Sequence, residues 1–161
     1  MSRIPVNMHR KYYILDAAYI MVVGSLPVDH EVVRYRVGEA RLAIRELLRL
    51  TSKPYEELGI DERYSMRYNL IVLVEALASL CIHIAVEEYG RLPSSYREAL
   101  RTVAERLAPR CSRELEALAG LRNLLVHRYW TVDDSTLYES IREDFGCVEE
   151  LLGRVEEVYL A

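Results

Sequence analysis

Glutamine is absent from the 161-residue sequence, and asparagine occurs only three times. Lysine is almost as scarce, with two residues against nineteen arginines. Depletion of heat-labile amides together with abundant charge is typical of heat-adapted proteins, although genome composition also raises arginine content. The formal net charge is −4, so the chain has no overall basic surface. A nucleic-acid contact would therefore require a local positive site.

Cysteine is also rare. Cys81, Cys111 and Cys147 lie about thirty residues apart, in an odd number and without any CxxC pair. This spacing argues against both a disulfide framework and a zinc site. We therefore expect three small core or surface residues and no metal.

A long uninterrupted apolar segment is missing from the N-terminal region. No signal peptide is expected, because the first residues, MSRIPVNMHRKYY, are not followed by an apolar core and a cleavage site. The apolar stretch 12–23 is too short to span a membrane and contains Asp16; whether it is a helix or a strand stays open. These features predict a cytoplasmic protein with no membrane association.

Strand patterns are nearly absent, whereas apolar residues recur at helical spacing along most of the chain. We expect an all-α fold, an up-and-down bundle of four to five helices in one domain at 29–161. Residues 1–28 form an N-terminal extension of unclear structure. The helices are expected near 31–51, 65–89 and 95–107, from Ser112 past Leu125, and from Asp133 or Asp134 almost to Ala161. Leu26 to Asp29 is the entry to the first helix, Ser95 has capping-box spacing to Glu98, and Ser112 is expected to cap the fourth helix.

The expected helix at 65–89 is apolar on almost every side, which predicts burial among several neighbours or at a subunit contact. Its polar exceptions step by four and form one narrow stripe: Glu75, Ser79, His83 and Glu87. In this setting we expect His83 to be a hydrogen-bonded core residue. Glu75 is expected to face His83 or an arginine inside the bundle.

The stretch LRNLLVHRYW, residues 121–130, places polar groups among leucines and a valine. Histidine moves protons near neutral pH, and arginine offers a fixed fork of donors to phosphate. Arg122 and His127 would suit RNA cleavage by attack of the 2′-hydroxyl, without a metal. Five helical positions turn through about 140°, so the two cannot share one face of a straight helix. The helix must end between them, or they serve different surfaces, or a second subunit completes the site.

The spacing also allows an ordinary structural role. In that case Arg122 pairs with a nearby acid, while His127 and Tyr129 finish a helix by hydrogen bonding. Two further alternatives stay open. Arg128 could hold phosphate or pair with an aspartate. A basic-aromatic patch could contact RNA, but we favour a solvated helix start at this position. That patch comprises Arg63, Tyr64, Arg67 and Tyr68.

The segment GLRNLLVHRYWTVDDSTLYESI resembles the signature of the HepT-like toxins of the HEPN superfamily, in which arginine, a polar residue, three further residues, histidine, any residue and tyrosine follow one another. The preceding MRYNLIVLVEALASLCIHIAVEEYGRLPSSYREAL is similar to the helices before that motif. The resemblance covers residues 29–160. Residues 1–28 match nothing in the family.

The resemblance implies an all-α homodimer in which the two motifs face each other across a cleft, with no cofactor. Arg122 would bind phosphate and stabilise the transition state, His127 would be the general acid and base, and Asn123 an auxiliary polar residue. Tyr129 would receive AMP from a cognate minimal nucleotidyltransferase antitoxin, and Arg128 is a further candidate RNA contact.

Together these features predict a metal-independent endoribonuclease toxin that is neutralised by AMP addition to its motif tyrosine. The alternative is a non-catalytic subunit that binds the nucleotidyltransferase and helps to present nucleotide or substrate to it. The two hypotheses share fold and partner. They differ over whether His127 moves protons.

Overall fold

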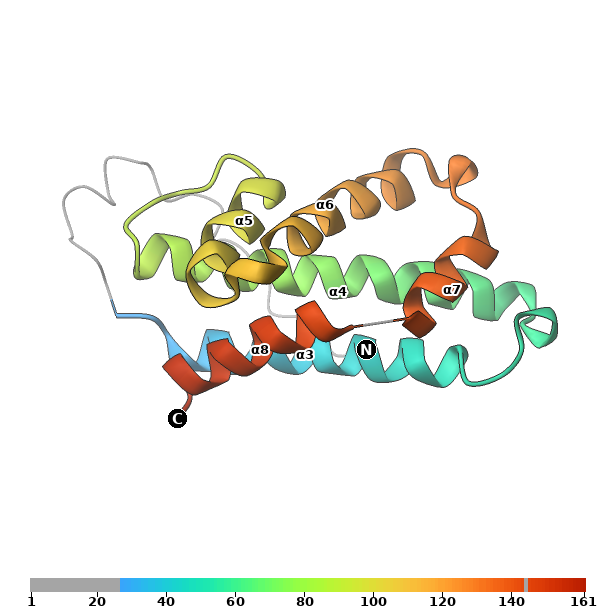
Figure 1. Ribbon diagram of the computed structural model, residues 1–161, viewed down its shortest axis with the longest axis horizontal. Coiled ribbons are helices and arrows are strands. Elements are labelled where there is room, and N and C mark those ends of the chain that lie inside the picture. The colour runs from blue at the N-terminus through green and yellow to red at the C-terminus, as the bar shows by residue number, and fades with distance from the viewer. Residues whose placement is uncertain (1–26, 144) are drawn as a thin grey trace, which may run out of the picture.

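Six α-helices and three 3₁₀ turns make up the computed structural model, which describes residues 27–143 and 145–161. The elements are α3 (His30–Leu50), η1 (Tyr55–Glu57), α4 (Ile60–Glu87), α5 (Tyr96–Leu107), η2 (Pro109–Cys111), α6 (Ser112–His127), η3 (Tyr129–Thr131), α7 (Asp134–Glu143) and α8 (Gly146–Tyr159) (Figure 1). No strand occurs in these ranges, which confirms the all-α prediction. The apolar stretch 12–23 lies outside the described residues.

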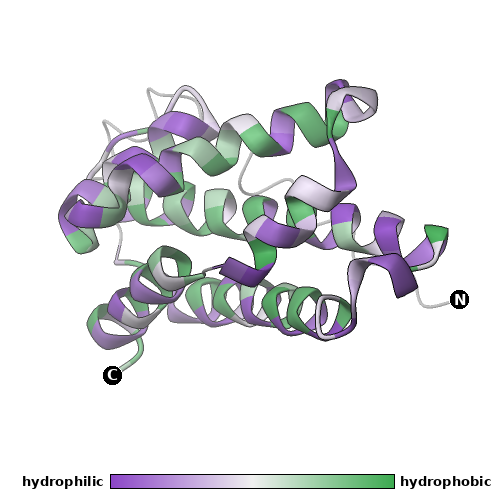
Figure 2. Cartoon of the chain, turned by 45° about the vertical axis from the view of Figure 1, so that its right-hand side comes forward, coloured by the Kyte–Doolittle hydropathy of each residue, from purple (hydrophilic) through white to green (hydrophobic). Residues whose placement is uncertain are grey.

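Helix α4 is the central element of the bundle. It runs antiparallel to α3 and packs against α5 and α6 (Figure 1). By length and composition this helix could cross a membrane, but 61% of its most apolar 18-residue stretch is buried inside the protein. Figure 2 shows hydrophobic segments of α4 enclosed by the surrounding helices. The burial predicted for this helix is therefore confirmed, and it serves as the core.

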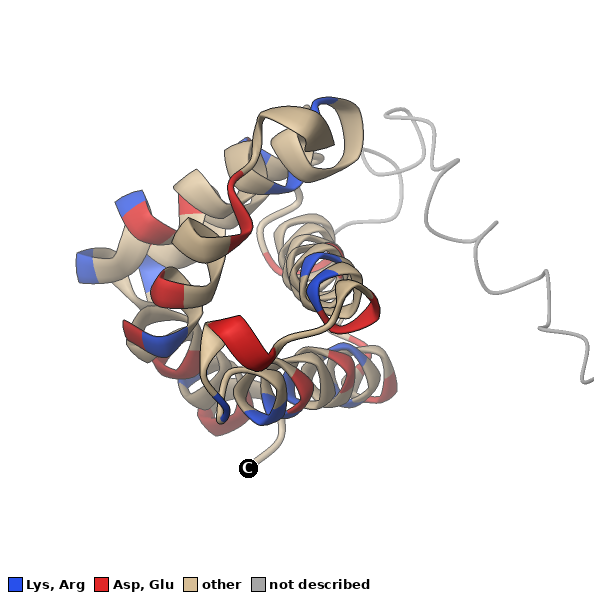
Figure 3. Ribbon diagram, turned by 90° about the vertical axis from the view of Figure 1, so that its right-hand side faces the viewer, with Lys and Arg blue, Asp and Glu red and all other residues tan. Residues whose placement is uncertain are grey.

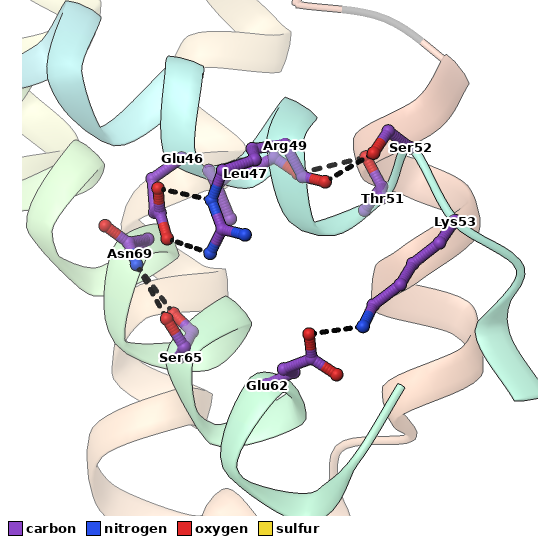
Figure 4. A network of polar contacts seen from close by, with 9 residues as sticks. All are labelled: Glu46, Leu47, Arg49, Thr51, Ser52, Lys53, Glu62, Ser65 and Asn69. Atoms are coloured by element: carbon purple, nitrogen blue, oxygen red, sulfur yellow. Dashed lines mark hydrogen bonds and ion pairs between the residues drawn. The ribbon is translucent and has the colours of Figure 1, made fainter. Parts of the chain in front are cut away.

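The hairpin between α3 and α4 explains why α4 begins at Ile60, five positions before the expected start. The Glu62 carboxylate accepts a hydrogen bond from the Gly59 N–H at 2.9 Å. Figure 4 shows the ion pair of its other oxygen with Lys53 Nζ, at 2.5 Å. These contacts satisfy a helix-start donor and hold the connection against the first turn. On α3, Thr51 Oγ1 donates to the Leu47 carbonyl at 3.0 Å, which closes that helix.

The helix starts at 29, 95 and 133 were predicted correctly. Asp29 and Ser95 accept hydrogen bonds from first-turn N–H groups of α3 and α5, and Asp133 accepts from Thr136 N–H at 3.0 Å. The expected cap at Ser112 is wrong. Ser112 is the first residue of α6, because the 3₁₀ turn η2 feeds directly into the helix.

The single last helix that we expected is in fact two, α7 and α8, separated near Phe145. Phe145 is half-buried against the core, and α8 then packs along α3. A disulfide joins Cys111 to Cys147, which corrects the expectation of three unpaired cysteines. Their Cα atoms lie 5.3 Å apart although the residues are 36 positions apart in sequence, so only tertiary packing brings them together.

Candidate active site

Arg122 lies on the inner side of α6 and faces α4. Its Nε donates to Glu75 Oε1 at 2.7 Å, and its Nη2 lies 2.6 Å from the same oxygen. The exposed fractions are 22% for the Arg122 side chain and 34% for Glu75. This pair confirms the expectation that Glu75 meets an arginine inside the bundle. Partial burial makes the contact stronger than a solvated surface pair.

Tyr96, the first residue of α5, completes the surroundings of this pair. Its hydroxyl donates to Glu75 Oε2 at 2.6 Å. Its ring lies beneath the guanidinium of Arg122, with 5.3 Å from Cζ to the ring centroid. Three helices therefore converge on one arginine. Sequence analysis did not identify Tyr96, because nothing in its local pattern marks a side chain that meets another helix.

Asn123 and His127 share a face of α6 one helical turn apart, and both are exposed. Asn123 Oδ1 accepts a hydrogen bond from Arg122 Nη1 at 3.1 Å. His127 is the last residue of α6, so the helix ends after the histidine rather than between it and the arginine. An ideal helix separates Arg122 from His127 by about 7.5 Å along its axis and about 140° around it. Within one subunit the two residues therefore start from different sides of α6.

Tyr129 and Trp130 lie in η3, directly after α6. Tyr129 is 60% exposed and Trp130 is 69% exposed. The two rings meet edge to face, with centroids 5.3 Å apart. Tyr129 thus presents its ring to solvent beyond His127, where another protein can reach it.

Arg67 of α4 holds η3 in place. Its Nη1 donates to the Tyr129 carbonyl at 2.6 Å and its Nη2 to the Val132 carbonyl at 2.7 Å. Arg63 donates to the Leu58 carbonyl at 3.2 Å and lies over the Tyr55 ring. Both arginines of the basic-aromatic patch thus have internal roles, which disfavours the patch as an RNA contact.

His83 is a core residue, as expected. It is 5% exposed, and its Nε2 accepts a hydrogen bond from the Asp29 N–H at 3.0 Å. Burial lowers its pKa, an effect that the nearby charge of Asp29 partly offsets. His83 fixes the start of α3 against α4 and takes no part in the motif.

The motif lies outside a cavity between the C-terminal helices. A cavity of about 430 Å³ opens between α6, α7 and α8, and leucines of α6 line much of it, including Leu115, Leu118 and Leu121. Arg122 and His127 are not among its lining residues. Figure 3 shows acidic and basic segments mixed along the helices rather than one continuous basic face in this view.

The sequence matches a known protein family. The model of the family "Ribonuclease HepT-like" matches residues 40–155. A curated protein of Archaeoglobus fulgidus, provisionally named as an RNase, is 28% identical over 121 residues, which cover 72% of this chain and 84% of that protein.

Solved structures show the same fold. A tri-AMPylated HEPN toxin of Shewanella oneidensis in complex with its MNT antitoxin superposes with a TM-score of 0.71 at 18% identity, over 78% of this chain and 97% of the toxin. A toxin–antitoxin structure with AMP-PNP gives 0.69 at 17% identity, over 77% and 97%. The family match covers well over half of the sequence, and residues 122–129 lie within the matched range. The chain belongs to the HepT-like ribonuclease family.

Proposed function

We propose that the protein is a metal-independent endoribonuclease toxin. The 2′-hydroxyl of the substrate attacks the adjacent phosphorus, and the bond from phosphorus to the 5′-oxygen breaks. His127 accepts the proton of the attacking hydroxyl and returns a proton to the leaving 5′-oxygen. Arg122 stabilises the charge that develops on the phosphate oxygens.

The observation that carries this proposal is the placement of Arg122 and His127. Arg122 is held half-buried by a neighbouring helix, whereas His127 stands exposed at the helix end. Because the two side chains diverge within one subunit, we propose a homodimer in which the motifs of both copies form one RNA-cleaving cleft. Asn123 assists beside Arg122, and Arg128 contacts the RNA backbone.

We further propose neutralisation by a cognate nucleotidyltransferase antitoxin that transfers AMP to Tyr129. The support is the exposed Tyr129 ring beyond the helix end, together with the AMP-modified toxin among the structural neighbours. An added phosphate beside Arg122 and His127 would repel an RNA phosphate and block the cleft. This step is tested by incubating the protein with antitoxin and ATP and measuring the added mass by mass spectrometry. Tyr129→Phe should gain no AMP at this position and should still cleave RNA.

Cleavage itself is tested with purified protein and RNA in EDTA. His127→Ala should cut at least about a hundredfold more slowly than the wild type, while the variant keeps its melting temperature. Equal activity of the two proteins would refute the assigned role of His127. Loss of activity of the wild type in EDTA but not in magnesium would refute metal independence.

The second candidate is a non-catalytic subunit that presents nucleotide or substrate to the nucleotidyltransferase. It is favoured by one observation, the internal Arg122–Glu75 pair, which a purely structural arginine would also form. Wild type and His127→Ala that are equally inert toward RNA, yet both bind the antitoxin, would support it.

Residues 29–161 are proposed as the HEPN domain and residues 1–28 as an extension to it. We also propose that the protein acts in the cytoplasm. Disulfides are uncommon there, but intracellular proteins of hyperthermophiles are a known exception. The amide-poor composition agrees with such a source.

A further inference from the structure

The Arg122 guanidinium is held by residues that lie outside the sequence motif. Glu75 engages its Nε and Nη2, and Asn123 engages its Nη1 at 3.1 Å. An arginine carries five N–H donors, and these contacts engage at most three of them. Among the contacts of residues 27–143 and 145–161, two N–H groups are thereby left for a phosphate oxygen, and their direction is set by the contact with Glu75.

Glu75 is itself held in place. One of its oxygens binds Arg122, and the other accepts from the Tyr96 hydroxyl at 2.6 Å. The Tyr96 ring also lies beneath the guanidinium plane. A carboxylate fixed at both oxygens has little rotational freedom, and the arginine that it binds is fixed in turn.

We propose that Glu75 and Tyr96 are positioning residues, which orient the Arg122 guanidinium for the transition-state phosphate. This inference rests on the proposed ribonuclease function. Neither residue touches the RNA. Their effect is to remove, before substrate binds, the side-chain freedom that a long arginine would otherwise lose in the transition state.

A positioning role and a merely electrostatic role predict opposite kinetics. Glu75→Gln removes a negative charge near the bound phosphate, so electrostatics alone would lower KM and leave kcat unchanged. If Glu75 positions Arg122, kcat falls about tenfold to a hundredfold while KM stays constant or falls. Tyr96→Phe, which keeps the ring and loses the hydroxyl, should give a smaller decrease in kcat.

The chain offers a matched control. On the α3–α8 side, Glu156 Oε1 accepts from both Nε and Nη2 of Arg41, the same arrangement that Glu75 makes with Arg122. The Glu156 side chain is 39% exposed against 34% for Glu75. Glu156→Gln should therefore lower the melting temperature by about as much as Glu75→Gln does, and it should leave kcat unchanged. An equal loss of kcat in both variants would overturn the positioning role.

A double-mutant cycle tests whether Glu75 acts through the arginine. In an Arg122→Lys background, Glu75→Gln should cause no further loss of kcat, because the group that it orients is gone. Independent, multiplicative losses would overturn the proposal.

One measurement does not depend on cleavage. In protein labelled with ¹⁵N-arginine, the Nε–H of Arg122, assigned with Arg122→Lys, should exchange slowly in the wild type and quickly in Glu75→Gln. Fast exchange in the wild type would refute the positioning role. Slow exchange in a protein that cuts no RNA would instead refute the proposed function alone.

Discussion

Arg67 of α4 and Asp134 at the start of α7 form a salt bridge, with 2.5 Å between Nε and Oδ1 and with 17% and 18% of the side chains exposed. The same guanidinium donates to the carbonyls of Tyr129 and Val132. One arginine therefore ties the segment that carries the candidate AMP-accepting tyrosine to the core helix. The backbone at Tyr129 is thus held from α4 as well as by its link to α6, which ends two residues earlier.

Arg67→Ala is expected to lower the free energy of unfolding by about 3 kcal/mol, because it removes the donor to Asp134 and to the Val132 carbonyl and one of the two donors to the Tyr129 carbonyl. AMP transfer to Tyr129 should also slow. Denaturant unfolding and mass spectrometry measure the two effects. Arg45→Ala, an exposed arginine on α3, is the control and should change neither. Unaltered stability in Arg67→Ala would show that η3 is held by other contacts.

Arg128→Ala is expected to weaken RNA binding without affecting the fold. Arg128 is exposed at the end of α6 and is the nearest cation to His127 along the chain. Loss of one phosphate contact should make the slope of log Kd against log salt shallower by about 0.7 for single-stranded RNA. Titrations of a non-cleavable 2′-O-methyl RNA at several salt concentrations measure the slope. An unchanged slope would remove Arg128 from the RNA contacts.

Acid should destabilise the protein through His83. Burial lowers the pKa of His83 in the folded state, so as the pH falls the unfolded chain takes up the proton first. The stabilising contribution is complete above about pH 6.5 and is lost as the pH falls from there toward the folded pKa. In His83→Gln, an amide oxygen can accept the same Asp29 N–H but does not titrate. Its stability should fall less steeply between pH 6.5 and 5; parallel profiles would contradict this assignment.

Reduction of the Cys111–Cys147 disulfide is expected to lower the free energy of unfolding by about 2–4 kcal/mol, since the bond closes a long loop in the unfolded chain. Denaturation with and without dithiothreitol measures the difference. A Cys111→Ala, Cys147→Ala double variant should be insensitive to the reductant.

Cys81 is buried and unpaired, and burial raises its pKa to about 12, so it should react only after unfolding. Three reactive thiols in oxidised, denatured protein would refute the disulfide.

Several features could be predicted because they depend on neighbours in the sequence. Apolar residues located α3 and α4, and the capping-box spacing at Ser95 located the start of α5. The isolated carboxylate of Glu75 on an apolar helix predicted an internal arginine partner, since a buried charge needs one. The start of α4 was misplaced because Glu62 and Lys53 close the hairpin through side chains that no periodicity reveals.

Sequence alone determined that the fold is all-α, where α3 to α6 lie along the chain, and which motif is the candidate for proton transfer and phosphate binding, because these properties follow from residue type and short-range spacing. Tertiary structure alone decided that Tyr96 meets Glu75, that Arg67 secures η3, and that Cys111 reaches Cys147. Those contacts join residues at least 21 positions apart. Their geometry is fixed only when the helices pack, since side chains on separate helices have no defined distance until a shared core sets the positions of their backbones.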